Sequence, residues 1–261
     1  MAEATTTRPA ETPLVVEEQF RGPPMSGNGG YVCGLVADRM TQGRHDLAND
    51  QAAEVTLRSP VPLDTEMTAV RSELGLQVMY GDKLVAEATM TELTMTVPAP
   101  PSWDAALAAR DQSPSMLRLH ADRLGVHPIC FCCGAELSPE QGLRVFAAAV
   151  PGFDGVAAAW QPHERFGDAD GWLPATHIWT ALDCPGMCAF MAQGTRVGLL
   201  GRMAARIIRP VNVHDRNLVI GWSMGVEGRK HFAGTAIYNE RGELCAYARS
   251  TWIGGTAPRK P

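Results

Sequence analysis

The chain has 261 residues, 45% of them hydrophobic and 20% charged, and a formal net charge of −5 at pH 7. This is the composition of a globular protein with enough apolar side chains for a core, and its negative charge argues against nucleic acid or an anionic membrane as a partner. The sequence has no apolar run as long as the roughly 18 residues of a membrane span, no signal-peptide pattern and no cysteine spacing of a secreted disulfide framework, so we expect a cytoplasmic protein with reduced thiols.

The first half of the chain predicts one helix followed by strands. Residues 1–13, rich in Thr and Pro, are expected to be a disordered lead-in. A folded unit is expected over residues 14–97. It opens with a glycine-rich turn and a helix whose apolar face carries Tyr31, Val32, Leu35, Val36 and Met40. Alternating apolar and polar residues from 52 to 96 then predict strands.

A linker and a second unit follow. Pro98, Pro100 and Pro101 mark a linker over residues 98–127, which is expected to be partly helical from 103 to 124. The second unit is expected over residues 128–254, with a frayed tail at 255–261. Strands are predicted within 143–162 and again from 203 to 252. The expected inward positions of the first strand region are Leu143, Val145, Val156 and Trp160.

One stretch, residues 171–191, predicts a buried helix with a carboxylate in its middle. Its apolar residues recur at helical spacing around Asp183, and Pro185-Gly186 are expected to kink the helix just after the acid. A carboxylate in such surroundings costs free energy unless it is paired, hydrogen-bonded or used in chemistry. The alternative interpretation is structural, with Asp183 capping a broken turn.

The two halves repeat each other. A helix that contains an acid, Asp38 or Asp183, precedes a run of strands in both. The run opens with 58–61 in one half and 208–211 in the other, and closes with 84–88 and 244–248. Chance matching of short apolar motifs is the alternative. Because each sheet must cover its own helix, two copies are expected to sit side by side as an internal pseudo-dimer.

Two motifs resemble a known family. The segment 130–134 (CFCCG), followed by 142–145 (GLRV), resembles the C-F-x-C-G…G-L motif of PaaI-like hotdog-fold thioesterases. The segment 28–32 (NGGYV) resembles the opening of the central helix in double-hotdog acyl-CoA thioesterases. The resemblance covers residues 15–96 and 128–254. It implies an α+β double hotdog, in which two central helices are each wrapped by a mainly antiparallel sheet.

The resemblance also implies an activity, the metal-independent hydrolysis of an acyl-CoA or acyl-carrier-protein thioester without a cofactor. In that scheme Asp183 is the base or nucleophile, and the backbone amides of Gly29 and Gly30 stabilise the oxyanion at a helix N-terminus. The family's His-Gly-Gly stands here as Asn28-Gly29-Gly30. In the second half it is replaced by residues 174–176 (PAT), so the first-half turn is the better preserved.

Further site residues follow from these positions. Thr176 and His177, near the start of the second helix, are expected to orient water or the thioester, although His177 equally fits a core or capping histidine. The substrate-binding residues are expected to be Asn28, Tyr31, Asp38, Trp179 and Arg209. Asp38 has an alternative as the partner of Arg39, and scattered surface charge explains Arg209 equally well.

Other functions and sites were weighed. A non-catalytic acyl-binding protein is the first alternative, and a hydratase or dehydratase that recruits His163 or His177 is the second. Residues 221–225 match G-x-S-x-G, but the strands predicted on both sides do not suit a nucleophile elbow. A compact cluster comprises His127, Cys130, Cys132 and Cys133. We expect its cysteines to be buried thiols and not ligands of a metal. A homodimer is compatible with exposed sheet edges.

Overall fold

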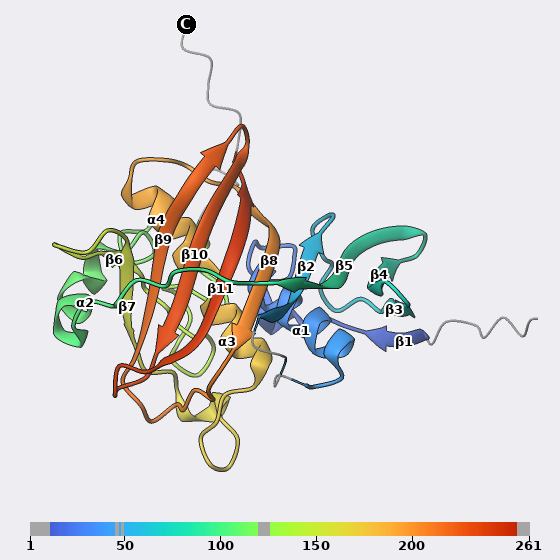
Figure 1. Cartoon of the computed structure of the whole chain (residues 1–261), viewed down its shortest axis with the longest axis horizontal. Coiled ribbons are helices and arrows are strands. Elements are labelled where there is room, and N and C mark those ends of the chain that lie inside the picture. Colours follow the sequence, from blue (N-terminus) through green and yellow to red (C-terminus); the bar gives the residue numbers. More distant parts are fainter. Residues whose placement is uncertain (1–10, 45–46, 48–49, 120–125, 255–261) are drawn as a thin grey trace, which may run out of the picture.

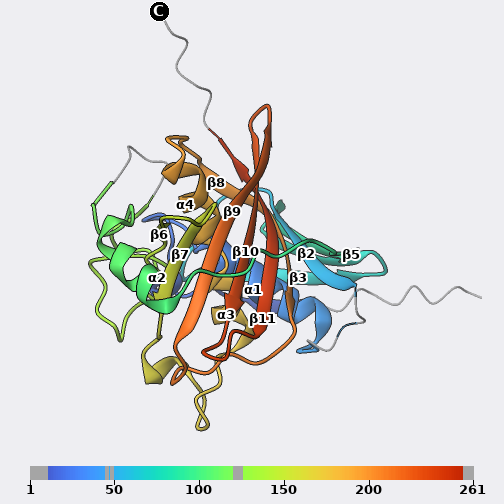
Figure 2. The same ribbon diagram turned by 60° about the vertical axis from the view of Figure 1, so that its left-hand side comes forward.

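The protein forms one curved sheet that wraps a row of helices (Figures 1 and 2). The computed structural model describes residues 11–44, 47, 50–119 and 126–254. The first half contributes β1 (Glu11–Leu14), α1 (Gly29–Thr41), β2 (Gln51–Leu57), β3 (Met67–Ser72), β4 (Gly75–Tyr80) and β5 (Lys83–Glu92). The second half contributes β6 (Ala148–Ala149), β7 (Val156–Trp160), α3 (Ala175–Ala181), α4 (Cys184–Ala192), β8 (Leu199–Ile207), β9 (Asn217–Glu227), β10 (Lys230–Tyr238) and β11 (Leu244–Ile253).

The order of the strands confirms the predicted duplication. The eleven strands run β1-β3-β4-β5-β2-β8-β11-β10-β9-β7-β6. In each half, the four strands after the central helix are arranged first, fourth, third, second, and the strand region before the helix adds to the outer edge. The halves join where β2 pairs antiparallel with β8, with Val55 opposite Met203. The fold is therefore the predicted α+β double hotdog.

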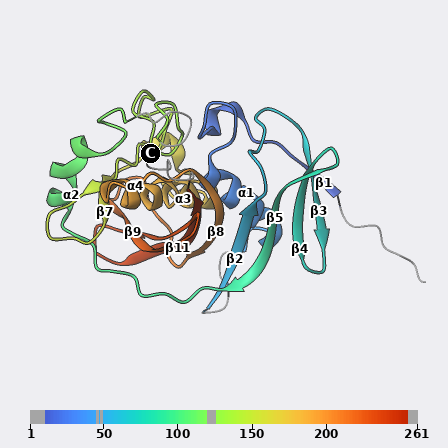
Figure 3. The ribbon, with the colours of Figure 1, turned by 90° about the horizontal axis from the view of Figure 1, so that it is seen from above.

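The helices lie together on one face of the sheet. Seen from above, α1, α3 and α4 sit inside its curve, while the segment after β5 runs across its outer side toward α2 (Trp103–Ala109) (Figure 3). Hydrogen bonds hold this segment to the outer face, from Tyr247 Oη to the carbonyl of Leu93 and from Tyr238 Oη to the carbonyl of Pro98. The larger core lies on the helix side and a smaller one under the crossing segment.

Two glycines on α1 let the central helices approach closely. A Cβ on Gly30 would lie 2.6 Å from the carbonyl oxygen of Trp179, and one on Gly34 would lie 2.9 Å from the Cα of Thr176. The two glycines are four residues apart and therefore share one face of α1. This seam brings the N-terminus of α1 against the junction of α3 and α4.

The predicted helix over 171–191 is two helices, and the break lies at the acid rather than after it. Helix α3 ends at Ala181, and α4 begins at Cys184 with Pro185 in its first turn. In a continuous helix the ring of Pro185 would clash with the carbonyl of Ala181, so the chain restarts before the proline. Asp183 occupies the N-cap position of α4 and takes a non-helical conformation.

Other boundaries differ from the predicted ones. Residues 11–13 belong to β1, which pairs with β3 at the edge of the sheet, where Pro13 is tolerated; residues 1–10 and 255–261 lie outside the described residues. The strand expected from residue 143 starts later, because Arg144 has a positive φ of 56°. The four predicted inward residues, Leu143, Val145, Val156 and Trp160, are all buried. The linker helix ends in a 3-10 turn (Arg110–Gln112), and residues 120–125 lie outside the description.

No described helix is both long and apolar enough to cross a membrane.

Candidate functional site

The junction of the two halves holds a buried carboxylate, Asp183, which is 3% exposed. Its Oδ2 atom accepts hydrogen bonds from the backbone amide of Gly30 and from Asn28 Nδ2, both at 2.9 Å. Its Oδ1 atom is buried and has no hydrogen-bond partner among the described residues. One carboxylate oxygen is therefore fixed by the first half of the chain, and the other is enclosed without a hydrogen bond from the described residues.

The first turn of α1 supplies both donors. Asn28 is the N-cap of α1, and its Oδ1 accepts a hydrogen bond from the amide of Tyr31 at 2.9 Å. This bond turns the amide nitrogen of the same side chain toward Asp183. The unpaired amides and the dipole at a helix N-terminus stabilise a negative charge, so the end of α1 partly offsets the cost of burying Asp183.

Burial nevertheless dominates the acidity of this group. Burial raises the pKa of Asp183 from 3.8 to about 7, against the opposing effects of the hydrogen bonds from Gly30 and Asn28. An acid with a pKa near neutrality can both accept and return a proton at the pH of a cell. A pKa raised in this way is more typical of a reactive carboxyl than of a structural one.

Asp183 lines a cavity of about 340 Å³ between the two halves. Most of its wall is apolar and includes Val32, Met187, Leu200 and Trp252. The uncharged polar groups and thiols of the wall accompany the acid and belong to Ser26, Asn28, Ser59, His127, Cys130, Cys133 and Cys184. Two exposed arginines, Arg58 and Arg229, also line it, and because they reach solvent they mark its opening.

The structure brings only some of the predicted site residues to this cavity. Asn28, Gly29 and Asp183 line it. Gly30 touches Asp183, but its amide donates to the carboxylate. The expected arrangement, with Gly30 and the acid on opposite sides of a substrate carbonyl, is therefore not present, because the glycine seam places the acid directly on this amide.

Thr176 and His177 lie away from the cavity. The His177 ring sits among the rings of Phe20, Tyr31, Phe131 and Phe166 at centroid distances of 5.3–6.2 Å. Its Nδ1 atom is 3.2 Å from Thr176 Oγ1. Burial lowers the pKa of His177 to about 4, so this histidine is neutral at pH 7 and packs as part of an aromatic cluster.

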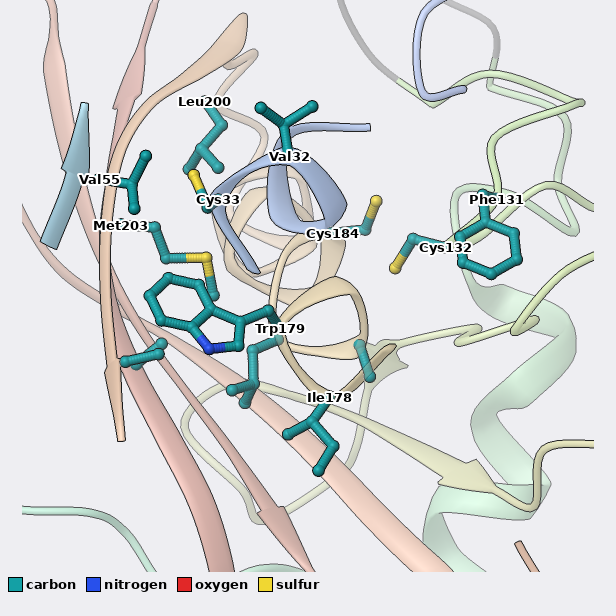
Figure 4. Packing of buried hydrophobic residues seen from close by; sticks show 14 of the residues in the cluster. Val32, Cys33, Val55, Phe131, Cys132, Ile178, Trp179, Cys184, Leu200 and Met203 are labelled. Atoms are coloured by element: carbon teal, nitrogen blue, oxygen red, sulfur yellow. The ribbon is translucent and has the colours of Figure 1, made fainter. Parts of the chain in front are cut away.

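The remaining predicted residues are also outside the cavity wall. Tyr31 stacks on Phe20, with ring centroids 3.9 Å apart. Trp179 is buried beside Met203 of β8 (Figure 4). Asp38 is near the C-terminal end of α1, where its carbonyl accepts the amides of Gln42 and Gly43. Arg209 donates to the carbonyl of Leu244 on the surface.

Two further predictions can be compared with the structure. Residues 221–225 lie within the continuous strand β9, so this G-x-S-x-G is not followed by a helix and does not form a nucleophile elbow. His163 lines a separate surface groove near Trp103, not the Asp183 cavity.

Four residues that line the cavity were not expected at the site. His127, Cys130 and Cys133 were expected only as members of a local cluster of buried groups, and Cys184 had no expected role. The sequence carried one signal for Cys184, which directly follows Asp183. For Cys133 the signal was its C-x-x-C spacing from Cys130, and both of these residues line the cavity.

The order of the strands and the cavity between the two halves define a double-hotdog protein. Comparison with known proteins supports this fold. No family model matches the chain, and no curated protein matches it. Among solved structures, the tesB protein of Mycobacterium avium subs paratuberculosis superposes with a TM-score of 0.59 at 12% identity, covering 94% of this chain and 93% of that one.

Two other structures extend this comparison. The acyl-CoA thioesterase II TesB2 from Mycobacterium marinum has a TM-score of 0.53 at 14% identity and covers 95% of this chain and 94% of its own. The dehydratase domain of a mycocerosic acid synthase-like polyketide synthase has a TM-score of 0.55 at 13% identity, covering 98% and 99%. The chain is thus similar in fold to TesB-like thioesterases and to polyketide dehydratase domains; the finer likeness of its second half to the PaaI-like group stays a prediction.

Proposed function

We propose that the protein hydrolyses acyl thioesters and that Asp183 is the catalytic base. The observation that carries the proposal is the state of the two carboxylate oxygens. Oδ2 is held by Gly30 and Asn28, Oδ1 has no hydrogen-bond partner among the described residues, and the residue lines a largely apolar cavity. A fixed carboxylate with one available oxygen can orient and deprotonate a water molecule.

The cavity supplies the other needs of the reaction. Its apolar wall suits an acyl chain, and its volume lies within the range of small-molecule sites. Gly29 opens α1 and lines the cavity, so its amide is the proposed donor to the oxyanion. Because Gly30 already donates to Asp183, this role falls to Gly29 alone of the two glycines expected from sequence.

The proposed reaction has two steps. Asp183 Oδ1 takes a proton from water, whose oxygen attacks the thioester carbonyl and forms a tetrahedral oxyanion. The intermediate then collapses with cleavage of the C–S bond, and protonated Asp183 returns the proton to the departing sulfur. The products are a carboxylic acid and a thiol, and the carboxylate is restored for the next turnover.

The opening of the cavity favours a carrier with phosphate groups. Arg58 and Arg229 provide positive charge there, although Arg58 also pairs with Glu87 on β5. Both acyl-CoA and acyl-carrier proteins present phosphates on a pantetheine arm, so we propose one of these two as the substrate.

A panel of acyl-CoA thioesters of increasing chain length tests the proposal. Released CoA is measured by chromatography for the wild-type chain, for Asp183→Asn and for Asp82→Asn, a matched change in the exposed turn between β4 and β5. We expect Asp183→Asn to lose about 10²–10⁴-fold in rate and Asp82→Asn to match the wild type. Full activity of Asp183→Asn contradicts the proposal, and binding without turnover by the wild type identifies a non-catalytic acyl-binding protein instead.

A second candidate is the hydration or dehydration of an acyl thioester. It is favoured by His127, which lines the same cavity as Asp183, because such chemistry uses a histidine and an acid around one substrate. Conversion of 3-hydroxyacyl-CoA to the enoyl product, followed in the ultraviolet, distinguishes the two. Turnover of that substrate without release of CoA favours the dehydratase.

A further inference from the structure

Three buried thiols converge beside Asp183 from two distant parts of the chain. Cys130 and Cys133 come from the loop before β6, and Cys184 is the first residue of α4. Their sulfur atoms all lie within 4.8 Å of one another, and those of Cys130 and Cys184 are 3.9 Å apart. All three are buried in the main core, at the point where it borders the cavity.

The fold holds the two segments at this separation. The loop is fixed by its own backbone, since the amide of Gly134 donates to the carbonyl of Cys130 at 2.7 Å and the amide of Val145 donates to that of Cys132 at 2.9 Å. Cys184 is fixed by the restart of the helix before Pro185. The three sulfurs are therefore brought together by the backbone and not by a flexible side chain.

We propose that Cys130, Cys133 and Cys184 bind one zinc ion in the wall of the cavity. Zinc binds thiolates at about 2.3 Å in a tetrahedron, which separates the sulfurs by about 3.8 Å. The Cys130–Cys184 distance meets this value without movement. The C-x-x-C spacing of the first two ligands is within the range typical of zinc sites. This site departs from the sequence-based expectation of no metal, because Cys184 could not be assigned to the cluster from sequence.

The first half of the chain also contacts Cys130. Asn28 Nδ2 donates to Cys130 Sγ at 3.6 Å as well as to Asp183 Oδ2. The same amide therefore joins the metal site to the candidate catalytic acid.

Zinc binding releases the protons of the three thiols. Three thiols release three protons and one Zn²⁺ ion takes three thiolates, which leaves a site with a net charge of −1. The thiol of Cys132 contacts those of Cys133 and Cys184 but is not one of the three proposed ligands. Figure 4 shows it beside Cys184. Three protein ligands would leave the fourth position of a tetrahedron for water, as in zinc sites with an open position.

The proposed zinc has a structural consequence. It clamps the 130–133 loop to the start of α4 and so fixes the backbone at Asp183. This inference does not depend on the proposed hydrolysis, because it concerns binding alone and its test reads metal and not turnover.

The test uses the full chain, reduced and purified, with zinc as the probe. Metal content is measured by mass spectrometry, and affinity by competition with a chromophoric indicator after removal of metal with a chelator. We expect one equivalent of zinc per chain. Replacement by Co²⁺ is expected to give a thiolate-to-metal charge-transfer band in the near ultraviolet.

Variants locate the site. Cys184→Ser and Cys133→Ser should each weaken zinc binding by more than about tenfold, which is the loss that even an outer partner of a metal ligand causes. Cys245→Ser removes another buried thiol, one that donates to the carbonyl of Glu243, and should bind zinc as the wild type does.

Three results would overturn the proposal. These are a reduced wild-type chain that does not compete with the indicator, a cobalt complex without the thiolate band, and unchanged affinity in Cys184→Ser. The first two are measured on the wild-type chain, so a variant that fails to fold does not leave the question open.

Discussion

The carboxylate of Asp183, at the start of α4, accepts a hydrogen bond of 2.9 Å from the amide of Gly30 at the start of α1. The two residues are 153 positions apart in the sequence. The bond joins the helix N-terminus of one half to the only acid at the junction of α3 and α4 in the other. The site is therefore built across the pseudo-two-fold interface and belongs to neither half alone.

The burial of Asp183 predicts an effect of pH on stability. In the metal-free protein the carboxyl loses its proton at about pH 7, whereas the unfolded chain loses it near 3.8. The native state thus binds more protons between these values, and the free energy of unfolding should fall as pH rises from about 4 to about 7. The loss is on the order of 4 kcal/mol at about 1.4 kcal/mol per pKa unit. Urea unfolding of wild type and Asp183→Asn across this range measures it.

The asparagine variant isolates this contribution, because an amide does not ionise. We expect it to be as stable as the wild type at the acid end of the range and more stable at the neutral end. A difference between the two proteins that does not vary with pH would show that Asp183 ionises as it does in the unfolded chain.

The proposed role as a base predicts the direction of the pH–rate profile. The ratio kcat/KM should rise as Asp183 ionises, with a midpoint at about pH 7, and should level off above it. Initial rates of CoA release between about pH 5 and 9, corrected for spontaneous hydrolysis, give the profile. A rate that falls through this midpoint indicates an acid in place of a base and supports dehydration.

Asn28 has two roles that substitution can separate. It caps α1 through the amide of Tyr31 and donates to Asp183, a bond that lowers the pKa of the carboxyl. Asn28→Ser keeps a capping oxygen but loses the donor, and Asn28→Ala loses both. Both variants should move the midpoint of the pH–rate profile upward, while only Asn28→Ala should lose about 1 kcal/mol of stability from the cap.

Ser102→Ala is the control for loss of a cap alone. Ser102 Oγ accepts the amide of Ala105 at the start of α2, which lies away from the cavity. It should lower stability slightly and leave the pH–rate midpoint in place. A midpoint that stays fixed in both Asn28 variants argues that the Asn28–Asp183 bond does not influence the acid.

The close contact of α1 with α3 at its glycines predicts that a Gly→Ala substitution there lowers stability, although such a change in a helix usually raises it. Gly→Ala inside a helix usually stabilises by roughly 0.5–1 kcal/mol. A Cβ on Gly34, however, would lie 2.8 Å from the Cβ of Trp179 and 2.9 Å from the Cα of Thr176. We expect Gly34→Ala to destabilise by about 1–3 kcal/mol, since the two helices must separate. Chemical denaturation measures the change, and a gain in stability would show that the helices move apart freely.

His177 predicts the opposite pH trend to Asp183. Burial lowers its pKa from 6.5 to about 4, so the unfolded chain binds a proton between these values and the native state does not. Stability should therefore rise with pH from about 4 to about 6.5. His177→Phe keeps the aromatic packing and removes the titration, so it should flatten this rise in urea unfolding curves. An unchanged slope would mean that the imidazole binds its proton in the folded chain as it does in the unfolded chain.

The regular elements were accessible from sequence because they depend on local periodicity. Val32, Val36 and Met40 recur on one face of α1, and alternation marked β2 and β5. The break at Asp183 was misplaced by two residues because periodicity does not say which side of a proline a helix restarts on. Arg144 likewise delayed the start of a predicted strand, because its backbone is left-handed and its residue type does not indicate this.

The sequence by itself determined the duplicated fold and singled out Asp183, since a repeated pattern and an acid among apolar residues are both visible in one dimension. The tertiary structure decided which groups meet that acid. The close approach of the helices at the glycines of α1 placed the donors Gly30 and Asn28 on Oδ2 of Asp183. The same packing put the His177 ring among aromatic rings and brought Cys184 to Cys130 and Cys133. Residue pattern records how deeply a side chain is buried, whereas its partners depend on how closely and at what angle two distant helices cross.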